Sequence, residues 1–399
     1  MLLPHDPARA FVPYPPVAVA CAPTGPLTGL SFAAKDLFDV AGYRTGGGNP
    51  LVLAMSEVKT AHAPAVQRLL DAGMRFVGKT HTDELAFSMN GRNAHFGTPR
   101  NGGAPDRIPG GSSSGSASAV SNRMCDTALG TDTGGSVRAP ASHCGLYGIR
   151  PTHGRIPLDR TLELAPSFDT CGFFARDAAT FARVADVLLG ADPAPLPTRV
   201  RLLRPLDAWA LLDADAAAAL APAFDAVQAA LGPADDLEVV GAAHWEAIYW
   251  HYRALQGREA WATDGAFIER FAPPLGPGVA ERFAWASRVT DAQVAEASAV
   301  RTRFGAALRG TLGTDGVLVL PTMPDVAPPL AADEASLEDY RNRAIRLLMI
   351  AGLAGVPQVS LPLATRLGAP LGISLVGPAG SDRSLVALAQ AIGATSPAA

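Results

Sequence analysis

The feature that most constrains the fold of this chain is a segment rich in glycine, serine and alanine that runs from residue 109 to residue 155. Glycine allows tight turns, and side chains this small let neighbouring elements pack backbone to backbone. The pattern predicts a loop at 110–113, a helix over 114–122 and a strand through 126–130. A tight glycine turn and a second helix, beginning near Val137, should follow. These elements are therefore expected to pack closely against one another.

Apolar segments on both sides of this region predict alternating strands and helices. Residues 31–40, SFAAKDLFDV, form an apolar strand that runs into a turn. Residues 64–73 have helical spacing of apolar side chains and end at a glycine, after which 74–80 has the pattern of a strand. Near the end of the chain, 316–322 and 357–378 predict strands that return to the same sheet. The predicted fold class is α/β.

The length of 399 residues is as compatible with two domains as with one large domain that carries an insertion. We expect a single domain over 1–399, with a core containing the catalytic residues over 25–190 and a C-terminal return to the sheet over 330–399. All five tryptophans and several alanine-rich amphipathic helices lie in 193–329. This interval is expected to be an all-helical layer that covers the front of the sheet and the substrate.

Composition and charge narrow the classes of partner. The net charge of -4, the pI near 6.1 and the absence of any Lys/Arg-rich run give no electrostatic signal for nucleic acid or an anionic membrane surface, which favours a small-molecule partner. The proline-rich N-terminal segment does not have the pattern of a signal peptide, and no apolar run is long enough to span a membrane. We expect a cytoplasmic protein. The four cysteines are widely spaced and indicate neither a zinc site nor a disulfide framework.

Two short motifs match known site patterns by their letters. Residues 73–80 fit the phosphate-binding pattern G-x-x-x-x-G-K-[ST], but the interior is strand-like and a helix precedes the first glycine, so the required context is missing. Lys79 is instead expected at the surface or at a strand end. Residues 111–115 fit the G-x-S-x-G nucleophile elbow, which would make Ser113 the nucleophile of an α/β-hydrolase esterase. Residues 107–109 form a poor preceding strand, so this remains the alternative.

Three further features carry a stronger indication of chemistry. Lys35 lies in an apolar strand, Ser112 lies in a Gly-Gly-Ser-Ser turn that opens a helix, and Ser136 ends a Gly-Thr-Asp-Thr-Gly-Gly-Ser turn that opens another. Each alone has an ordinary explanation, because a lysine can extend from a strand end or pair with Asp36, and Gly-Ser turns are common linkers. These ordinary explanations do not account for the presence of all three features in one chain.

Together these features resemble the amidase signature family over most of the chain. Residues 110–157 match its serine- and glycine-rich signature, and AKD at Lys35, VGKT at Gly78, LPT at Leu320 and the terminal GISLVGPAGSDRSL follow in the family's order. The segments FAAKDLFDV, AFSMNGRNAHFGTPRN and PGGSSSGSA are most similar to the short amidases that include indole-3-acetamide hydrolases of the plant amidase 1 type. The resemblance implies a large mixed central β-sheet sandwiched between layers of α-helices.

The resemblance also implies a serine amidase mechanism without a metal or cofactor. Ser136 would be the nucleophile, Ser112 the proton shuttle and Lys35 the final base. A serine hydroxyl needs such a base, and only a neutral amine accepts a proton, a form that burial in an apolar strand favours. The Gly111–Ser112 peptide is expected to be cis.

The residues around Ser136 receive supporting roles from the same resemblance. The backbone N–H groups of Thr133, Gly134, Gly135 and Ser136 would form an oxyanion hole. Two charged residues in the same turn, Asp132 and Arg138, would brace it, with ordinary surface charges as the other explanation, and Ser113 would be a hydrogen-bond partner.

The sequence limits the substrate only to a small linear amide, most simply a primary carboxamide. Met89, Trp245 and Tyr249 are expected to line its pocket, although an aromatic stripe on a helix more often belongs to a core. The alternatives are the glutaminase-type subunit of an amidotransferase, which would need a partner, and a binding protein without activity. A homodimer is compatible with the sequence.

Overall fold

The computed structural model describes residues 6–395; the first five residues of the N-terminal segment and residues 396–399 lie outside this range. Its strands form one mixed sheet in the order β2-β1-β3-β5-β4-β9-β10-β8-β6-β7. The strands are β1 (Ser31–Lys35), β2 (Arg75–Thr80), β3 (Thr127–Thr131), β4 (Tyr147–Arg150), β5 (Cys171–Ala175), β6 (Arg201–Pro205), β7 (Ala234–Leu237), β8 (Gly316–Pro321), β9 (Gln358–Arg366) and β10 (Ala369–Val376). Pairing is parallel at both ends of the sheet and antiparallel in the middle.

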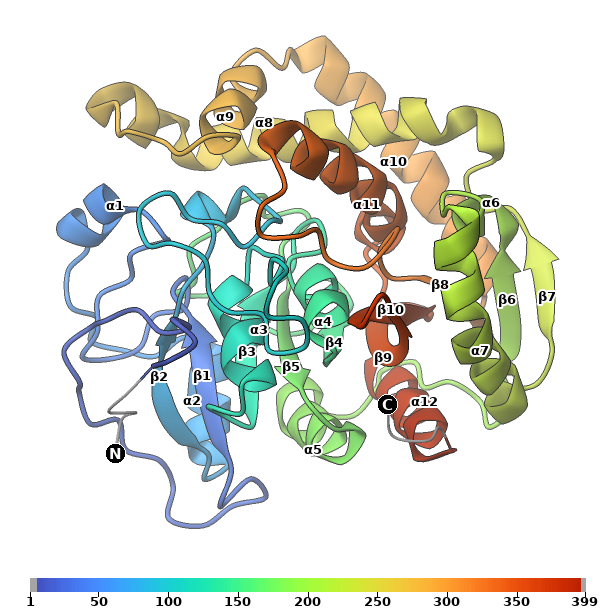
Figure 1. The fold of residues 1–399 in the computed structure, drawn as a ribbon, viewed down its shortest axis with the longest axis horizontal. Helices are drawn as coiled ribbons and strands as arrows, with labels where there is room; N and C mark the ends of the chain where they lie inside the picture. Colours follow the sequence, from blue (N-terminus) through green and yellow to red (C-terminus); the bar gives the residue numbers. More distant parts are fainter. Residues whose placement is uncertain (1–5, 396–399) are drawn as a thin grey trace.

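Helices cover this sheet on both faces (Figure 1). They are α1 (Pro50–Met55), α2 (Pro64–Asp71), α3 (Ser114–Ser121), α4 (Arg138–Cys144), α5 (Ala178–Leu189), α6 (Leu206–Trp209), α7 (Ala214–Leu231), α8 (Trp245–Phe271), α9 (Val279–Ala286), α10 (Asp291–Leu312), α11 (Glu334–Ala354) and α12 (Asp382–Thr395). Figure 1 shows α8, α9 and α11 grouped at the top of the view, above α3 and α4. The α/β fold with a mixed sheet between helical layers is confirmed.

The alternation of side chains along the strands explains the two helical layers. Phe32 and Ala34 of β1 belong to the larger core cluster, which includes apolar side chains of α2 and α5. Ala33, between them, belongs to a second cluster with the small side chains of α3 and α4. Successive residues of a strand point to opposite faces, so α2 and α5 cover one face and α3 and α4 the other. The small residues of α3 and α4 let these helices pack closely on the sheet.

The interval 193–329 differs from the expected all-helical layer, and that prediction was wrong. It contains the strands β6 and β7 at one end of the sheet, as well as β8, which was predicted. β6 is short and carries arginines at both its first and fourth positions, and β7 consists of the sequence ADDL with two exposed aspartates. Short, polar edge strands carry little of the apolar alternation by which strands are recognised.

The positions of the two short motifs in this fold show whether each has the structural context that its function requires. Residues 75–80 of the phosphate-loop match form strand β2 after helix α2, as predicted, so they provide no phosphate-binding turn. Lys79 lies near the strand end but is buried rather than at the surface, with its Nζ 2.7 Å from Asp36 Oδ1. Among the described residues, no strand leads directly into Gly111, and the buried Ser113 hydroxyl donates to the Thr131 carbonyl. The nucleophile elbow is therefore absent.

Candidate active site

The first part of the site lies where two parallel strands end side by side. β1 pairs in parallel with β3, so Lys35 and Thr131 meet at the same edge of the sheet. The Lys35 Nζ lies 2.7 Å from Ser112 Oγ and 2.7 Å from Thr131 Oγ1. Lys35 and Ser112 are fully buried. Lys35 and Ser112 could be identified from the sequence pattern, whereas Thr131 could not, because its place next to Lys35 depends on strand pairing.

Burial changes the protonation of Lys35. Desolvation of the ammonium form lowers the pKa of Lys35 to about 7, although the nearby carboxylates of Asp83, Asp169 and Asp132 act in the opposite direction. A lysine amine in water has a pKa near 10.4 and stays charged at neutral pH. In this site, a large share of Lys35 is the neutral amine at pH 7, which can accept a proton.

The two serine-containing turns lie against each other. The peptide between Gly111 and Ser112 is cis, as expected. The next residue, Ser113, donates its N–H to the Ser136 carbonyl at 3.2 Å and its hydroxyl to the Thr131 carbonyl at 3.2 Å. Ser113 thus joins the turn that carries Ser112 to the turn that carries Ser136, and to the end of β3. This agrees with its expected place beside the site.

A buried ion-pair network holds the glycine turn in place. The Asp132 carboxylate accepts hydrogen bonds from the Arg138 guanidinium, at 3.0 Å from Nε and 2.7 Å from Nη2, and Arg150 Nη1 lies 3.1 Å away. It also accepts the backbone N–H of Val137 at 3.1 Å. Although burial alone would raise the pKa of Asp132, the charges of Arg138 and Arg150 keep it well below its usual range. Asp132 and Arg138 are therefore internal braces, whereas Arg150 was missed by the sequence analysis.

The same network reduces the set of backbone amides that can form the expected oxyanion hole. The Gly135 N–H donates to Asp132 Oδ1 at 3.0 Å, so this amide already has an acceptor. The amides of Thr133, Gly134 and Ser136 remain as candidate donors. A Cβ on Gly135, whose φ is +120°, would lie 2.4 Å from Leu348 Cδ1. The turn therefore needs glycine at this position for both its backbone conformation and its close packing against α11.

A small pocket opens beside Ser136, with a cavity of about 10 Å³, enough for about one water molecule. Its lining residues are Ala86, Phe87, Ser88, Met89, Thr133, Gly134, Ser136, Leu164, Tyr252, Gln256, Arg341 and Ile345. Met89 is among these lining residues, and its expected contact with the substrate stays a prediction. Ser136 is 5% exposed and lines this pocket together with Ser88.

Trp245 and Tyr249 do not line this pocket, contrary to expectation. Helix α8 contributes Tyr252 and Gln256 instead. All four residues follow one stripe at helical spacing, so the stripe was recognised correctly but the pocket lies over its later turns. The Tyr249 hydroxyl is engaged elsewhere, since it donates to Asn342 Oδ1 at 2.5 Å.

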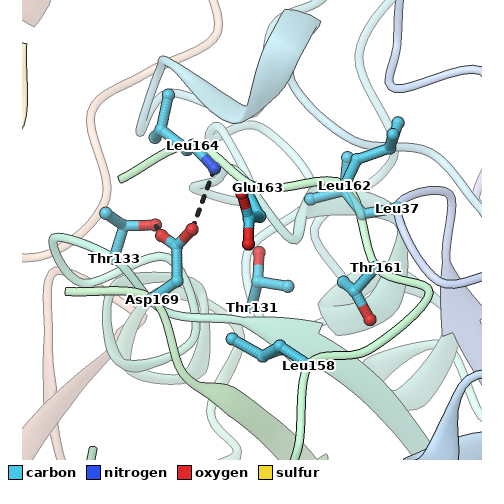
Figure 2. A pocket seen from close by; sticks show the side chains of 9 residues that line it. All are labelled: Leu37, Thr131, Thr133, Leu158, Thr161, Leu162, Glu163, Leu164 and Asp169. Atoms are coloured by element: carbon cyan, nitrogen blue, oxygen red, sulfur yellow. Dashed lines mark hydrogen bonds between the residues drawn. The ribbon is translucent and has the colours of Figure 1, made fainter. Parts of the chain in front are cut away.

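A second small cavity lies on the other side of Thr133 (Figure 2). Its lining includes Leu37, Leu158, residues 161–164 and Thr131, which contacts Lys35. Asp169 accepts the Thr133 hydroxyl at 2.5 Å and the Leu164 N–H at 2.9 Å, as the dashed lines in Figure 2 show. Thr133 and Leu164 line both cavities, so a thin wall of side chains separates two spaces next to the candidate catalytic groups.

The described residues, 6–395, contain neither a cluster of metal-binding side chains nor a helix that could cross a membrane. No group of three or more His, Cys, Asp and Glu side chains in this range is arranged to hold a metal ion. None of the helices in this range is both long and apolar enough to cross a membrane.

Comparisons with known proteins show which family the chain is similar to. The sequence profile of the family described as Amidase matches residues 17–216 and 243–386. The chain is similar to Amidase 1 of Arabidopsis thaliana, with 40% identity over 95% of this chain and 96% of that protein. It is also similar to 2-amino-5-chloromuconic acid deaminase of Comamonas testosteroni, with 35% identity over 92% of this chain and 82% of the relative. A crystal structure of an amidase has 32% identity and a TM-score of 0.84, over 94% of this chain and 86% of the other.

Proposed function

Because the chain belongs to the amidase signature family and is a hydrolase acting on amides, we propose that it cleaves the C–N bond of a small, linear, primary carboxamide through an acyl-enzyme on Ser136. The observation that carries the proposal is the buried Lys35 amine, 2.7 Å from the Ser112 hydroxyl, with a pKa lowered to about 7 by burial. This pair can accept a proton at neutral pH. Ser136 lies in the adjoining turn and faces the pocket.

The reaction runs in two halves. Neutral Lys35 accepts the Ser112 proton while Ser112 accepts the proton of Ser136, whose Oγ attacks the amide carbonyl carbon. The amides of Thr133, Gly134 and Ser136 stabilise the resulting oxyanion. The C–N bond then breaks, and the leaving nitrogen takes a proton from Ser112 as Lys35 returns its own, releasing ammonia. Water attacks the acyl-enzyme by the same relay and yields the carboxylate and free Ser136.

The walls of the pocket beside Ser136 combine apolar side chains, Phe87, Met89, Leu164 and Ile345 among them, with polar ones, and the substrate's acyl part would lie against them. The resemblance to short plant-type amidases makes an aryl-acetamide such as indole-3-acetamide one candidate substrate to be tested. The similarity to relatives named Amidase 1 and 2-amino-5-chloromuconic acid deaminase supports cleavage of a C–N bond. A cytoplasmic location and a homodimer remain proposals that fractionation and light scattering would check.

The experiment is ammonia release from a panel of primary amides: indole-3-acetamide, phenylacetamide, malonamide, glutamine and butyramide. Wild type and Ser136→Ala are assayed side by side. Ser113→Ala is the matched control, because Ser113 would be the nucleophile if the chain were an α/β-hydrolase esterase. We expect turnover of at least one amide that is lost in Ser136→Ala. Turnover that survives in Ser136→Ala but not in Ser113→Ala would refute the assignment, and turnover only with a co-purified partner would favour an amidotransferase subunit.

A further inference from the structure

The pocket beside Ser136 contains buried polar atoms that lack partners. Among the described residues, no hydrogen-bond partner exists for Arg341 Nε, the Tyr252 hydroxyl or Gln256 Oε1. All three side chains line the pocket and are buried, with exposed fractions of 3%, 0% and 4%. Buried polar atoms in folded proteins are almost always satisfied by protein, water or ligand. The unsatisfied donors therefore indicate a polar group that belongs in this space.

The charges around the pocket indicate the sign of that group. Arg341 lies with two other buried arginines, Arg282 and Arg253, and their charges influence one another. Glu338 accepts from Arg341 Nη1 at 3.2 Å and from Arg282 Nη1 at 3.3 Å. Arg253 donates only to the neutral Tyr249 hydroxyl, at 2.8 Å, and its Nε has no partner within the described residues. Glu338 is thus the one carboxylate hydrogen-bonded to any of these three buried positive charges among the described residues, with Asp83 acting on Arg282 through its charge alone, and an additional anion would be stabilised.

The polar side chains of this pocket reach from the arginine cluster to the turn that carries Ser136. A Cβ on Gly134 would lie 2.4 Å from the Tyr252 hydroxyl and 3.0 Å from Gln256 Nε2, so both side chains contact the candidate oxyanion turn. Arg341 lines the same small pocket as Ser136. An anionic group that reaches Arg341 is therefore only a short distance from the carbonyl that Ser136 would attack.

We propose that the substrate's acyl part carries a carboxylate bound by Arg341, so that the substrate is a short monoamide of a dicarboxylic acid. This inference rests on the proposed function, because the only leaving group of a primary amide is ammonia and the charge must then be on the acyl part. The Arg341 guanidinium has the planar fork that suits a carboxylate. Hydrolysis consumes one water and yields a dicarboxylate and ammonia.

The test compares amides that differ mainly in charge: succinamate against butyramide, and glutaramate against valeramide. The measured quantity is the ratio of kcat/KM within each pair for wild type, Arg341→Met and Arg343→Met. Arg343 is the matched control, since it lies on α11 but is 39% exposed and pairs with Asp339. We expect wild type to prefer the charged member about tenfold or more, and Arg341→Met to reduce that preference by about tenfold or more. Arg343→Met should keep it.

The inference would be overturned if wild type had equal kcat/KM for the charged and the neutral amide, or a higher value for the neutral one. It would also be overturned if Arg341→Met lowered kcat/KM equally for both amides, because that result would show a structural role for Arg341. If Arg341→Met does not fold, inhibition of wild type decides: succinate should inhibit at least about tenfold more strongly than butyrate, and equal inhibition would refute the carboxylate site. If charged and neutral amides are both hydrolysed through Ser136 with the same kcat/KM, the carboxylate site is refuted but the proposed amidase function is not. If no amide is hydrolysed, the proposed function fails, and calorimetric binding of succinate but not butyrate still decides whether the anion site exists.

Discussion

The lowered pKa of Lys35 predicts how the activity depends on pH. The neutral amine is the active form, and burial lowers the pKa of Lys35 to about 7. The fraction of neutral Lys35 then rises from about 9% at pH 6 to about 50% at pH 7 and about 91% at pH 8. The rate constant kcat/KM for a neutral amide should rise about tenfold over this range and then level off, because this quantity reports the ionisation of the free enzyme.

The assay is ammonia release at low substrate concentration between pH 5.5 and 8.5, at constant ionic strength. A neutral amide is used so that the substrate itself does not titrate. The circular dichroism spectrum at each pH controls for unfolding. A profile that is flat over this range, or one in which kcat/KM falls as the pH rises from 6 to 8, would contradict the role of neutral Lys35 as the base.

Three substitutions test the surroundings of the site. Asp132→Asn should destabilise the fold by about 3–5 kcal/mol in urea unfolding, because it leaves the buried charges of Arg138 and Arg150 without their carboxylate; a change below about 1 kcal/mol would contradict the bracing role. Gly135→Ala should lower kcat at least about tenfold, since the new Cβ meets Leu348 and shifts the turn. The control Gly232→Ala has a similarly positive φ of +100° but open space around it, and should keep kcat. Thr131→Val removes a hydrogen-bond partner of Lys35 and should reduce kcat/KM about tenfold, and unchanged kcat/KM would show that Thr131 does not position the amine.

Local patterns predicted the elements that carry the site. The apolar spacing before Gly73 and the strand that follows it correspond to α2 and β2, and the small-residue segment corresponds to α3, β3 and α4. These elements are recognisable because burial imposes a period on their own residues. β7 lacks such a period because it is a polar strand at the edge of the sheet, and β6, next to it, is only five residues long with arginines at its first and fourth positions.

Contacts between distant segments could not be predicted in this way. Thr131 reaches Lys35 because β1 and β3 are parallel, and Arg150 reaches Asp132 from β4. Tyr252 and Arg341 meet Ser136 only where α8 and α11 cover the sheet. The stripe on α8 identifies its buried face but not which turn lies over the pocket, so Trp245 and Tyr249 could not be told apart from the residues that line it. Tertiary packing, rather than local sequence, determines these positions.

The most direct test of the account is the identity of the residue that becomes acylated. Wild type is mixed with a slowly hydrolysed activated ester or amide at pH 7, quenched with acid and digested, and the modified peptide is sequenced by mass spectrometry. The account predicts an acyl group on Ser136 that is absent in Ser136→Ala and forms much more slowly in Lys35→Ala. An acyl group on Ser113 or Ser112 instead, or an unchanged rate of acylation in Lys35→Ala, would contradict it.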